Sequence, residues 1–197
     1  VFTLGKWGKA TGYRLPPSPE FPDGQTIMFK DPKTHVVTPR LGIQVTSQFV
    51  LPKGDTLVMK NQLIDLCRRS GIKPEFFAMD RTGGSGQGVA DLMKNEWSAA
   101  FHAVNFSESS SESKIMQEDT QTAYDQYLLV CTELWFALRA FGEFGYLLID
   151  PAVDMTKLTP QLTQRKYRAS GSKTKVENKK DFILRGNPSP DEADSLT

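Results

Sequence analysis

Apolar and polar positions alternate in some stretches of the chain and recur at helical spacing in others. Residues 41–51 alternate, which predicts a half-buried strand that is antiparallel to its neighbours. Residues 1–8 have the pattern of the end of a strand and its turn, and residues 25–29 that of a short strand. The four prolines within residues 14–25 predict a rigid loop before the short strand.

The next stretch has the spacing of a helix, followed by that of a strand–helix–strand unit. Asp55 or Thr56 caps the first helix, whose apolar residues recur every three or four positions. Residues 75–79 predict a short apolar strand, residues 86–95 an amphipathic helix, and residues 99–106 another strand. Because a helical crossover joins parallel strands, these two strands should be parallel.

The second half of the chain is predicted to be mainly helical. It begins with a polar, low-complexity stretch at residues 107–114, which is interpreted as a mobile surface loop. Apolar residues at helical spacing over residues 120–142 predict the longest helix, and this stripe is interpreted as core that packs on the sheet rather than as a cofactor site. Residues 158–167 predict another helix, and residues 174–180 an edge strand or hairpin arm.

A last helix is predicted to begin close to the end of the sequence. Ser189 is a favourable N-cap, Pro190 suits the first helical position, and Glu192 completes a capping box. Asp191 and Asp194 are three residues apart in this helix, so both side chains should face the same way.

Composition fits one domain of ordinary size. The chain has 197 residues and a formal net charge of +1, which excludes a uniformly basic nucleic-acid coat and an acidic tail protein. Cys67 and Cys131 lie in helical patterns and predict no disulfide framework, and the two distant histidines, His35 and His102, argue against a zinc site. No apolar run is long enough to predict a membrane span, and the abrupt start suggests a piece of a longer protein.

Asp80 directly follows the apolar strand and precedes a glycine-rich stretch at residues 81–88. A carboxylate in this position would lie at the carboxyl edge of the sheet, where open α/β sheets bind ligands. The alternative is that Asp80 caps the turn or the following helix. This stretch alone leaves both interpretations open.

Carboxylates from a strand end and from a late helix, brought together, would form a site for magnesium or manganese. Such cations take oxygen ligands and keep positions open for phosphate and water. Two of them about 3.5–4 Å apart can activate an attacking water and stabilise the leaving oxygen in phosphodiester cleavage. For Asp191 and Glu192 the alternative is compensation of the helix dipole, which applies less well to Asp194, one turn further in.

Three stretches of the sequence resemble a known family. They are FFAMDRTGGSGQGVADLM, YDQYLLVCTELWFALRAFGEFG and TKVENKKDFILRGNPSPDEADSL, within residues 41–197. These stretches are similar to the nuclease domain of the large terminase subunit of tailed bacteriophages. The terminal Ser-Pro-Asp-x-Ala-Asp-x-Leu, preceded by Glu177-x-Lys179 and Arg185-Gly186, is the most specific part of the resemblance.

The resemblance implies a ribonuclease-H-like fold, an α/β fold with a mixed sheet of antiparallel strands followed by a βαβ unit, flanked by helices. It implies an endonuclease that cuts concatemeric double-stranded viral DNA with two Mg²⁺ or Mn²⁺ ions during genome packaging. Asp80 matches the family's acid at the end of the middle strand, Asp194 matches the acid in the last helix, and Asp191 is a supporting or alternative ligand. The implied partners are viral DNA, the small terminase subunit and the portal protein, in the cytoplasm of the infected bacterial host.

The sequence departs from the family pattern at its start. The family's first acid lies on the first strand, but residues 1–8 contain no acid, and Asp23 and Asp31 lie in predicted loops. We therefore expect residues 1–197 to be a single nuclease domain that lacks the start of its first strand and an upstream ATPase domain, which leaves the activity of this piece open. The stretch at residues 84–88 lacks the lysine of a phosphate-binding loop and is interpreted as a turn beside the active site or the DNA backbone.

Basic residues gather late in the sequence with few acids between them. They are Arg165, Lys166, Arg168, Lys173, Lys175, Lys179, Lys180 and Arg185. Only Glu177 and Asp181 oppose them in this span. The stretch is interpreted either as an arm that contacts DNA phosphates without reading the sequence, or as an ordinary solvated face.

Two other functions remain open at this point. One is another ribonuclease-H-like nuclease, such as a Holliday-junction resolvase, against which the Ser-Pro-Asp-x-Ala-Asp pattern argues. The other is a non-catalytic assembly or scaffold domain of a viral motor, in which the acids are structural. The upstream sequence would discriminate between them, because a first strand that ends in Asp would favour a nuclease.

Overall fold

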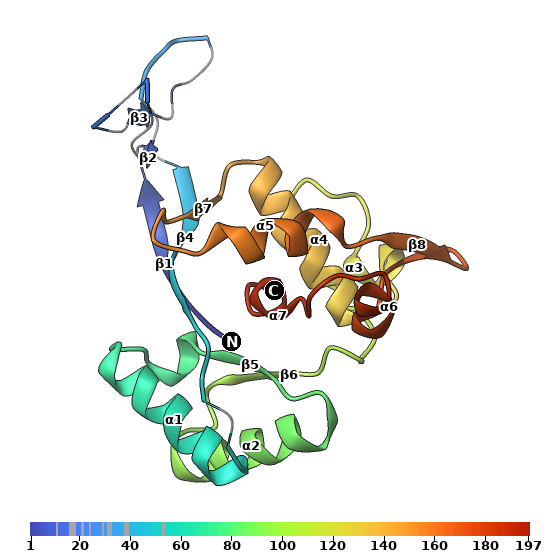
Figure 1. Ribbon diagram of the computed structural model, residues 1–197. Helices are drawn as coiled ribbons and strands as arrows, with labels where there is room; N and C mark the ends of the chain where they lie inside the picture. Colours follow the sequence, from blue (N-terminus) through green and yellow to red (C-terminus); the bar gives the residue numbers. More distant parts are fainter. Residues whose placement is uncertain are drawn as a thin grey trace.

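The structure, a computed structural model shown in Figure 1, describes most of the chain. The described residues are 1–10, 12–15, 19–20, 22–23, 25–28, 30, 33–37, 40–52 and 54–197. Asp31 and part of the loop predicted for residues 14–25 lie outside them.

The described strands form two separate main sheets (Figure 1). β1 (Phe2–Ala10) is antiparallel to β4 (Arg40–Phe49), and β4 is parallel to β7 (Leu147–Ile149). β5 (Ala78–Asp80) and β6 (His102–Val104) form a parallel pair of their own. The prediction that the strand in β4 is antiparallel to its neighbours is therefore confirmed for β1 and wrong for β7.

The first strand is longer than its sequence pattern predicts. β1 continues through Gly8, which lies opposite Gly42 of β4, so the turn predicted within residues 1–8 is wrong. Two glycines can face each other across an antiparallel ladder without ending it, because backbone hydrogen bonds alone maintain the pairing. β2 (Gly12–Leu15) pairs with β3 (Gln25–Met28), which confirms the short predicted strand, and the pair extends away from the helices (Figure 1).

The predicted βαβ unit is present, with shifted boundaries. A 3₁₀ turn, η1 (Pro74–Phe76), replaces the first residues of the predicted strand, because Pro74 favours the start of a helical turn. β5 and β6 are parallel with Asp80 opposite Val104, as expected. They are joined by α2 (Gly83–Glu96), which begins three residues earlier than predicted and includes the glycines.

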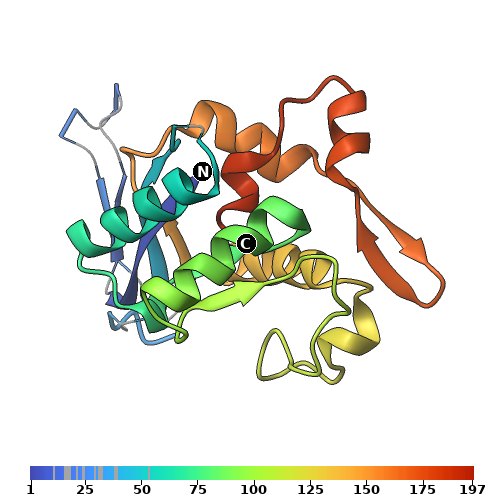
Figure 2. The same cartoon turned by 90° about the horizontal axis from the view of Figure 1, so that it is seen from below.

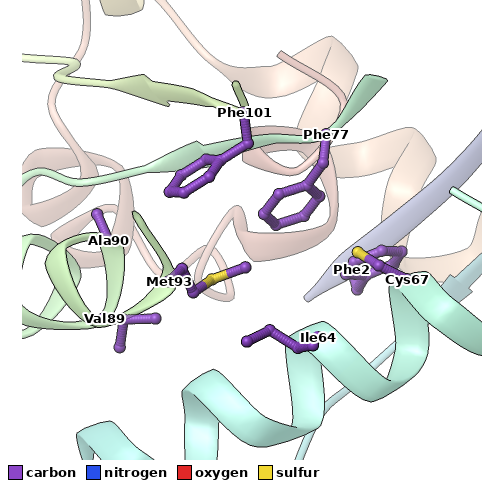
Figure 3. Close-up of a cluster of buried hydrophobic side chains, with 8 residues drawn as sticks. All are labelled: Phe2, Ile64, Cys67, Phe77, Val89, Ala90, Met93 and Phe101. Carbon is purple, nitrogen blue, oxygen red and sulfur yellow. The ribbon is translucent and has the colours of Figure 1, made fainter. Parts of the chain in front are cut away.

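One hydrophobic core joins this unit to the start of β1 (Figure 3). α1 (Thr56–Arg69) is capped by Asp55, whose carboxylate accepts a hydrogen bond from Val58 N at 2.9 Å, as predicted. Ile64 and Cys67 of α1 pack against α2 and the βαβ strands. Phe2 of β1 stacks on Phe77, just before β5, with ring centroids 5.9 Å apart. The start of β1 therefore lies against the β5–β6 unit without pairing to it.

A second core covers the β1–β4–β7 sheet with the later helices. These are α4 (Val130–Glu143), α5 (Met155–Gln164) and α7 (Asp191–Asp194). Its buried residues are Val45, Trp135, Val153, Leu158, Val176 and Ala193. The stripe on the long predicted helix thus contributes to core through Trp135, as interpreted from the sequence.

The predicted helix over residues 120–142 is in fact two helices. α3 (Ala123–Gln126) and α4 are separated by an extended segment, in which Leu128 N donates to Thr174 O at 2.9 Å and Tyr127 forms a bridge with Thr174. The strand that contains Thr174 supplies hydrogen bonds that the helix would otherwise provide, so the helical pattern is interrupted there.

The polar stretch at residues 107–114 is attached to the helices. Ser110 is buried, and its hydroxyl donates to Tyr127 O at 2.5 Å. Ser111 donates to both carboxylate oxygens of Glu133, from its backbone N at 2.7 Å and from its hydroxyl at 2.5 Å. The surface loop is confirmed for residues 107–109 and 112–114, which are exposed, whereas Ser110 and Ser111 attach the stretch to α4 and to the segment that precedes it; its mobility stays a prediction.

The C-terminal part forms a hairpin and two short helices. β8 (Tyr167–Ser170) and β9 (Lys173–Val176) turn through Gly171, whose φ of 64° suits glycine. This confirms the hairpin arm predicted for 174–180 only over residues 174–176, because residues 179–180 begin the next helix, and the helix predicted for 158–167 ends at Gln164. α6 (Lys179–Leu184) then leads to α7, which lies between α5 and the β5–β6 pair in Figures 1 and 2. No helix among the described residues is long and apolar enough to cross a membrane.

Candidate active site

Asp80 ends β5 and is exposed; its interpretation as a turn cap is confirmed, and its role as a ligand stays a prediction. Its Oδ1 accepts a hydrogen bond from Thr82 N at 2.7 Å, as a turn-capping carboxylate does. Its Oδ2 accepts no hydrogen bond from the described residues. The cap therefore fixes the carboxylate while one oxygen stays free for a ligand.

The glycine-rich stretch is the first part of α2 and lies directly on the end of β5. A Cβ added to Gly86 would come within 3.0 Å of Asp80 O and of Arg81 C. Only glycine allows the helix to approach the strand end this closely. The interpretation of this stretch as a turn is therefore corrected to a helix start, and its closeness to Asp80 is confirmed.

The residues that hold this strand end in place were not predicted from the sequence. The hydroxyl of Thr82 donates to Asn105 Oδ1 at 3.2 Å and accepts from Phe106 N at 2.8 Å. Arg81 pairs with Glu108 at 2.7 Å. A signal was present, because Asn105 follows β6 one position after the register partner of Asp80.

Asp194 lies on α7 and is held by two donors on one oxygen. Arg165 Nη1 donates to Asp194 Oδ1 at 2.5 Å, and Trp135 Nε1 donates to the same oxygen at 3.2 Å. The guanidinium of Arg165 lies over the indole of Trp135, 4.5 Å from its ring centroid. Asp194 Oδ2 accepts no hydrogen bond from the described residues, so it too is available to a ligand.

Asp191, at the start of α7, is ion-paired with Lys179. Burial would raise the pKa of Asp191, but the hydrogen bond and charge of Lys179 outweigh it, and the pKa is lowered. The two aspartates of α7 thus contact different basic residues, although the sequence predicted that they would face the same way.

The predicted capping box at the start of α7 is wrong. Pro190 is the N-cap and makes no side-chain cap bond. The carboxylate of Glu192 accepts instead from Gln161 Nε2 of α5 at 2.6 Å. Gln161 is buried, so its side-chain NH₂ group needs a hydrogen-bond partner. Because Glu192 is that partner, its carboxylate is not used in the predicted cap.

The charges of Asp80 and Asp194 both act on Cys131 of α4. Burial raises the pKa of the Cys131 thiol, the negative charges of Asp194 and Asp80 raise it further, and Arg165 opposes them. Asp80 and Asp194, which belong to different elements, therefore both contribute negative charge to the environment of this thiol. No group of three or more Asp, Glu, His or Cys side chains within the described ranges could hold a metal ion.

The basic residues predicted to contact DNA fall into two groups. Arg165, Lys179 and Arg185 are paired with acids, and Lys173 Nζ lies 3.5 Å from the ring centroid of Tyr124. The others make no ion pair with a described residue; they are Lys166, Arg168, Lys175 and Lys180. Arg168 of β8 lies directly opposite Lys175 of β9. Like charges opposite each other destabilise a hairpin unless an anion lies between them.

Several solved structures have this fold. The nuclease domain of the large terminase subunit gp2 of bacterial virus Sf6 superposes with a TM-score of 0.65 and 21% sequence identity, covering 80% of this chain and 77% of that one. A lysine-to-alanine variant of that domain with manganese gives a TM-score of 0.63 at 20% identity, covering 80% and 79%. The same variant with calcium gives 0.63 at 20% identity, covering 80% and 78%. No family model matches the chain, and no curated protein does.

The chain has the fold of a phage terminase nuclease domain, which is ribonuclease-H-like. The predicted fold class, a mixed α/β sheet flanked by helices, is confirmed. At this level of identity the likeness shows the fold, and the chemistry has to be argued from the residues.

Proposed function

We propose that the chain is the nuclease domain of a genome-packaging terminase and cuts double-stranded viral DNA with divalent metal ions. The observation that carries the proposal is the placement of Asp80 and Asp194. Within the fold of a terminase nuclease domain, Asp80 ends β5 and Asp194 lies on α7, and each keeps one carboxylate oxygen free of hydrogen bonds from described residues. Manganese and calcium in the Sf6 structures support the use of a divalent ion.

The donors present suit Mg²⁺ or Mn²⁺ but form an incomplete set. Both cations prefer carboxylate oxygens, which Asp80 and Asp194 supply. Asp191 would support them as a ligand through the oxygen that Lys179 does not contact, or in place of its contact with Lys179. Two bound ions would activate the attacking water and stabilise the leaving oxygen. The chain's own part is to hold these carboxylates in place, Asp80 through Thr82 and Asp194 through Arg165 and Trp135.

A further acid is proposed to come from residues upstream of β1. β1 and β5 each pair on one side only among the described strands, and Phe2 stacks on Phe77 beside both free edges. The start of β1 also lies beside α7, where Thr3 Oγ1 is 2.6 Å from Ser195 Oγ. A preceding strand that entered here would reach the candidate site.

The unpaired basic face of the β8–β9 hairpin is proposed to hold the DNA backbone. Arg168 and Lys175 form the cross-strand pair that an anion would stabilise, and phosphate is the anion that duplex DNA offers at regular spacing. Viral DNA, the small terminase subunit and the portal protein are the proposed partners, in the cytoplasm of the infected host. Contacts of this kind position DNA without reading its sequence.

A non-catalytic assembly domain is the second candidate, and one observation favours it. Both aspartates of α7 are already ion-paired, Asp191 with Lys179 and Asp194 with Arg165, as expected for structural acids. Another ribonuclease-H-like nuclease, such as a resolvase, would share the two-acid site but not the packaging role.

The cleavage test uses the chain extended upstream through the preceding strand. With Mn²⁺ or Mg²⁺ it should nick plasmid DNA with little sequence preference. Asp80→Asn and Asp194→Asn should each abolish nicking, because removing one ligand from a small set greatly weakens ion binding. The matched control is Asp65→Asn, an exposed acid on α1 that makes no ion pair with a described residue. Undiminished nicking by Asp80→Asn would show that Asp80 is not part of the active site. No nicking by the extended chain or by any of its variants would favour the assembly domain.

A further inference from the structure

Asp194 is attached to the base of the β8–β9 hairpin through one arginine. Arg165 Nη1 donates to Asp194 Oδ1 at 2.5 Å, and Arg165 Nε donates to Glu177 O at 2.9 Å. Arg165 precedes β8 and Glu177 follows β9, so one guanidinium joins the carboxylate to both ends of the hairpin. The Arg165 side chain is only 4% exposed, which excludes the interpretation that it belongs to an ordinary solvated face.

The Asp194 carboxylate is fixed in orientation as well as in position. Trp135 Nε1 donates to Oδ1 at 3.2 Å, so this oxygen receives two donors. Rotation of the carboxylate would break both bonds at once. The other oxygen, Oδ2, has no donor among the described residues and is the one left to an ion.

The arginine itself is fixed by its planar shape. It lies over the Trp135 ring at 4.5 Å and directs different nitrogens to Asp194 and to Glu177. A lysine in its place would keep the positive charge but could not reproduce this fork, because an ammonium is a compact point charge on a flexible chain. Charge and geometry can therefore be separated by substitution.

We propose that Arg165 is a positioning residue for metal binding at Asp194: together with Trp135 it occupies Oδ1 and presents Oδ2 to the ion. The inference rests on the proposed function, in which Asp194 is a metal ligand. Residues that orient a metal ligand typically contribute about 10–100-fold to metal affinity. The opposite role would be to weaken ion binding, because the positive charge of Arg165 repels a cation beside it.

The test measures Mg²⁺ binding to the 197-residue chain by calorimetry and by the indole N–H resonance of Trp135, assigned with Trp135→Phe. Arg165→Lys and Arg165→Gln should both bind Mg²⁺ about 10–100-fold more weakly than the unmodified chain. The matched control is Arg139, which is also ion-paired, with Glu143, and lies 6.0 Å from the Phe136 ring. Arg139→Lys and Arg139→Gln should leave Mg²⁺ affinity unchanged.

Two outcomes would overturn the proposal. Unchanged affinity in Arg165→Lys would mean that charge alone matters and that the fork does not position Asp194. Tighter binding in Arg165→Gln would mean that Arg165 acts as an opposing cation. Circular dichroism of each variant separates both outcomes from loss of folding.

A metal-free measurement distinguishes failure of this inference from failure of the proposed function. Without metal, Arg165→Lys should move the Trp135 indole resonance toward its position in Asp194→Asn, because the carboxylate is no longer held against the indole. An unchanged resonance refutes the positioning role. If the resonance moves but neither the unmodified chain nor the chain extended upstream through the preceding strand binds Mg²⁺, Arg165 still orients the Asp194 carboxylate and the metal-binding function fails.

Discussion

Single residues determine how closely the elements around the candidate site approach one another. Gly86 is the clearest case, because its missing side chain lets α2 lie on the carbonyl of Asp80. Thr82 and Asn105 then connect the ends of β5 and β6 through a 3.2 Å hydrogen bond. The position of Asp80 thus depends on small and polar neighbours more than on its own side chain.

Gly86→Ala is expected to destabilise the chain by about 1–3 kcal/mol, because the added methyl forces backbone atoms apart where α2 packs on β5. Gly84→Ala is the matched control, since a Cβ there meets nothing within 4 Å. That variant should be stabilised by about 0.5–1 kcal/mol, the usual gain in a helix. Urea unfolding followed by circular dichroism measures both. Equal effects of the two substitutions would contradict the close approach of α2 to β5.

Site residues could be predicted where neighbours in the sequence determine their position. They could not be predicted where their contacts come from residues far away in the chain. The strand end at Asp80 follows from a local apolar run and the glycines after it. The partners of Asp194 could not be predicted, because Trp135 and Arg165 lie 59 and 29 residues away in the chain and belong to other parts of the fold.

Elements were predicted well where local spacing decides them and poorly where a distant strand intervenes. α1 with its Asp55 cap forms as the pattern indicates. The break before α4 does not follow from its own pattern, because Leu128 bonds to Thr174, which comes much later in the chain. In the same way Gln161 of α5 removes Glu192 from the cap predicted for α7.

The β8–β9 hairpin is the element on which DNA binding can be tested. Arg168→Ala with Lys175→Ala should weaken binding to all duplex sequences and make the log–log salt slope less negative by about 0.9 for each phosphate that the hairpin no longer neutralises. Neither residue forms an ion pair with a described acid, whereas Lys173 lies on Tyr124. Folding should change little, because unpaired charges at the surface contribute little to stability.

The control for the hairpin removes the same charge elsewhere. Arg68 of α1 and Lys94 of α2 are exposed and make no ion pair with described residues. Arg68→Ala with Lys94→Ala should leave the salt slope as it is. Fluorescence anisotropy of a labelled duplex at several salt concentrations measures the salt slope of both double variants. Equal slopes would show that the hairpin is an ordinary solvated face that does not contact DNA.

Within the part of the chain that the structure describes there are two hydrophobic cores, and the β1–β4 ladder contributes residues to both. Phe2 of β1 belongs to the core with α1 and α2, and Val45 of β4 belongs to the core with α4, α5 and α7. The resemblance to a known family implied the fold class but not this division, because the separation of the β1–β4–β7 sheet from the β5–β6 pair depends on strand edges that no local pattern describes.

Native-state hydrogen exchange should therefore show two levels of protection in the chain. Amides of α1, α2, β5 and β6 should open together, and those of α4, α5 and β7 should open at a different free energy, because each core is a contiguous packed unit. Leu158→Ala, at a fully buried position in the second core, should lower the protection of that core far more than of the first. A uniform loss across both cores would show that the chain opens as one unit.

The two candidate ligands are anchored in different cores, Asp80 at the end of β5 and Asp194 on α7. An ion shared by them would act as a cross-link between parts of the chain that otherwise open separately. By mass action it would add about 2.7 kcal/mol at a free concentration roughly one hundred times its dissociation constant. If the proposed metal-dependent cleavage holds, the ion needed for cleavage would also make the domain unfold cooperatively. A domain short of metal would then be both inactive and the easier target for proteolysis.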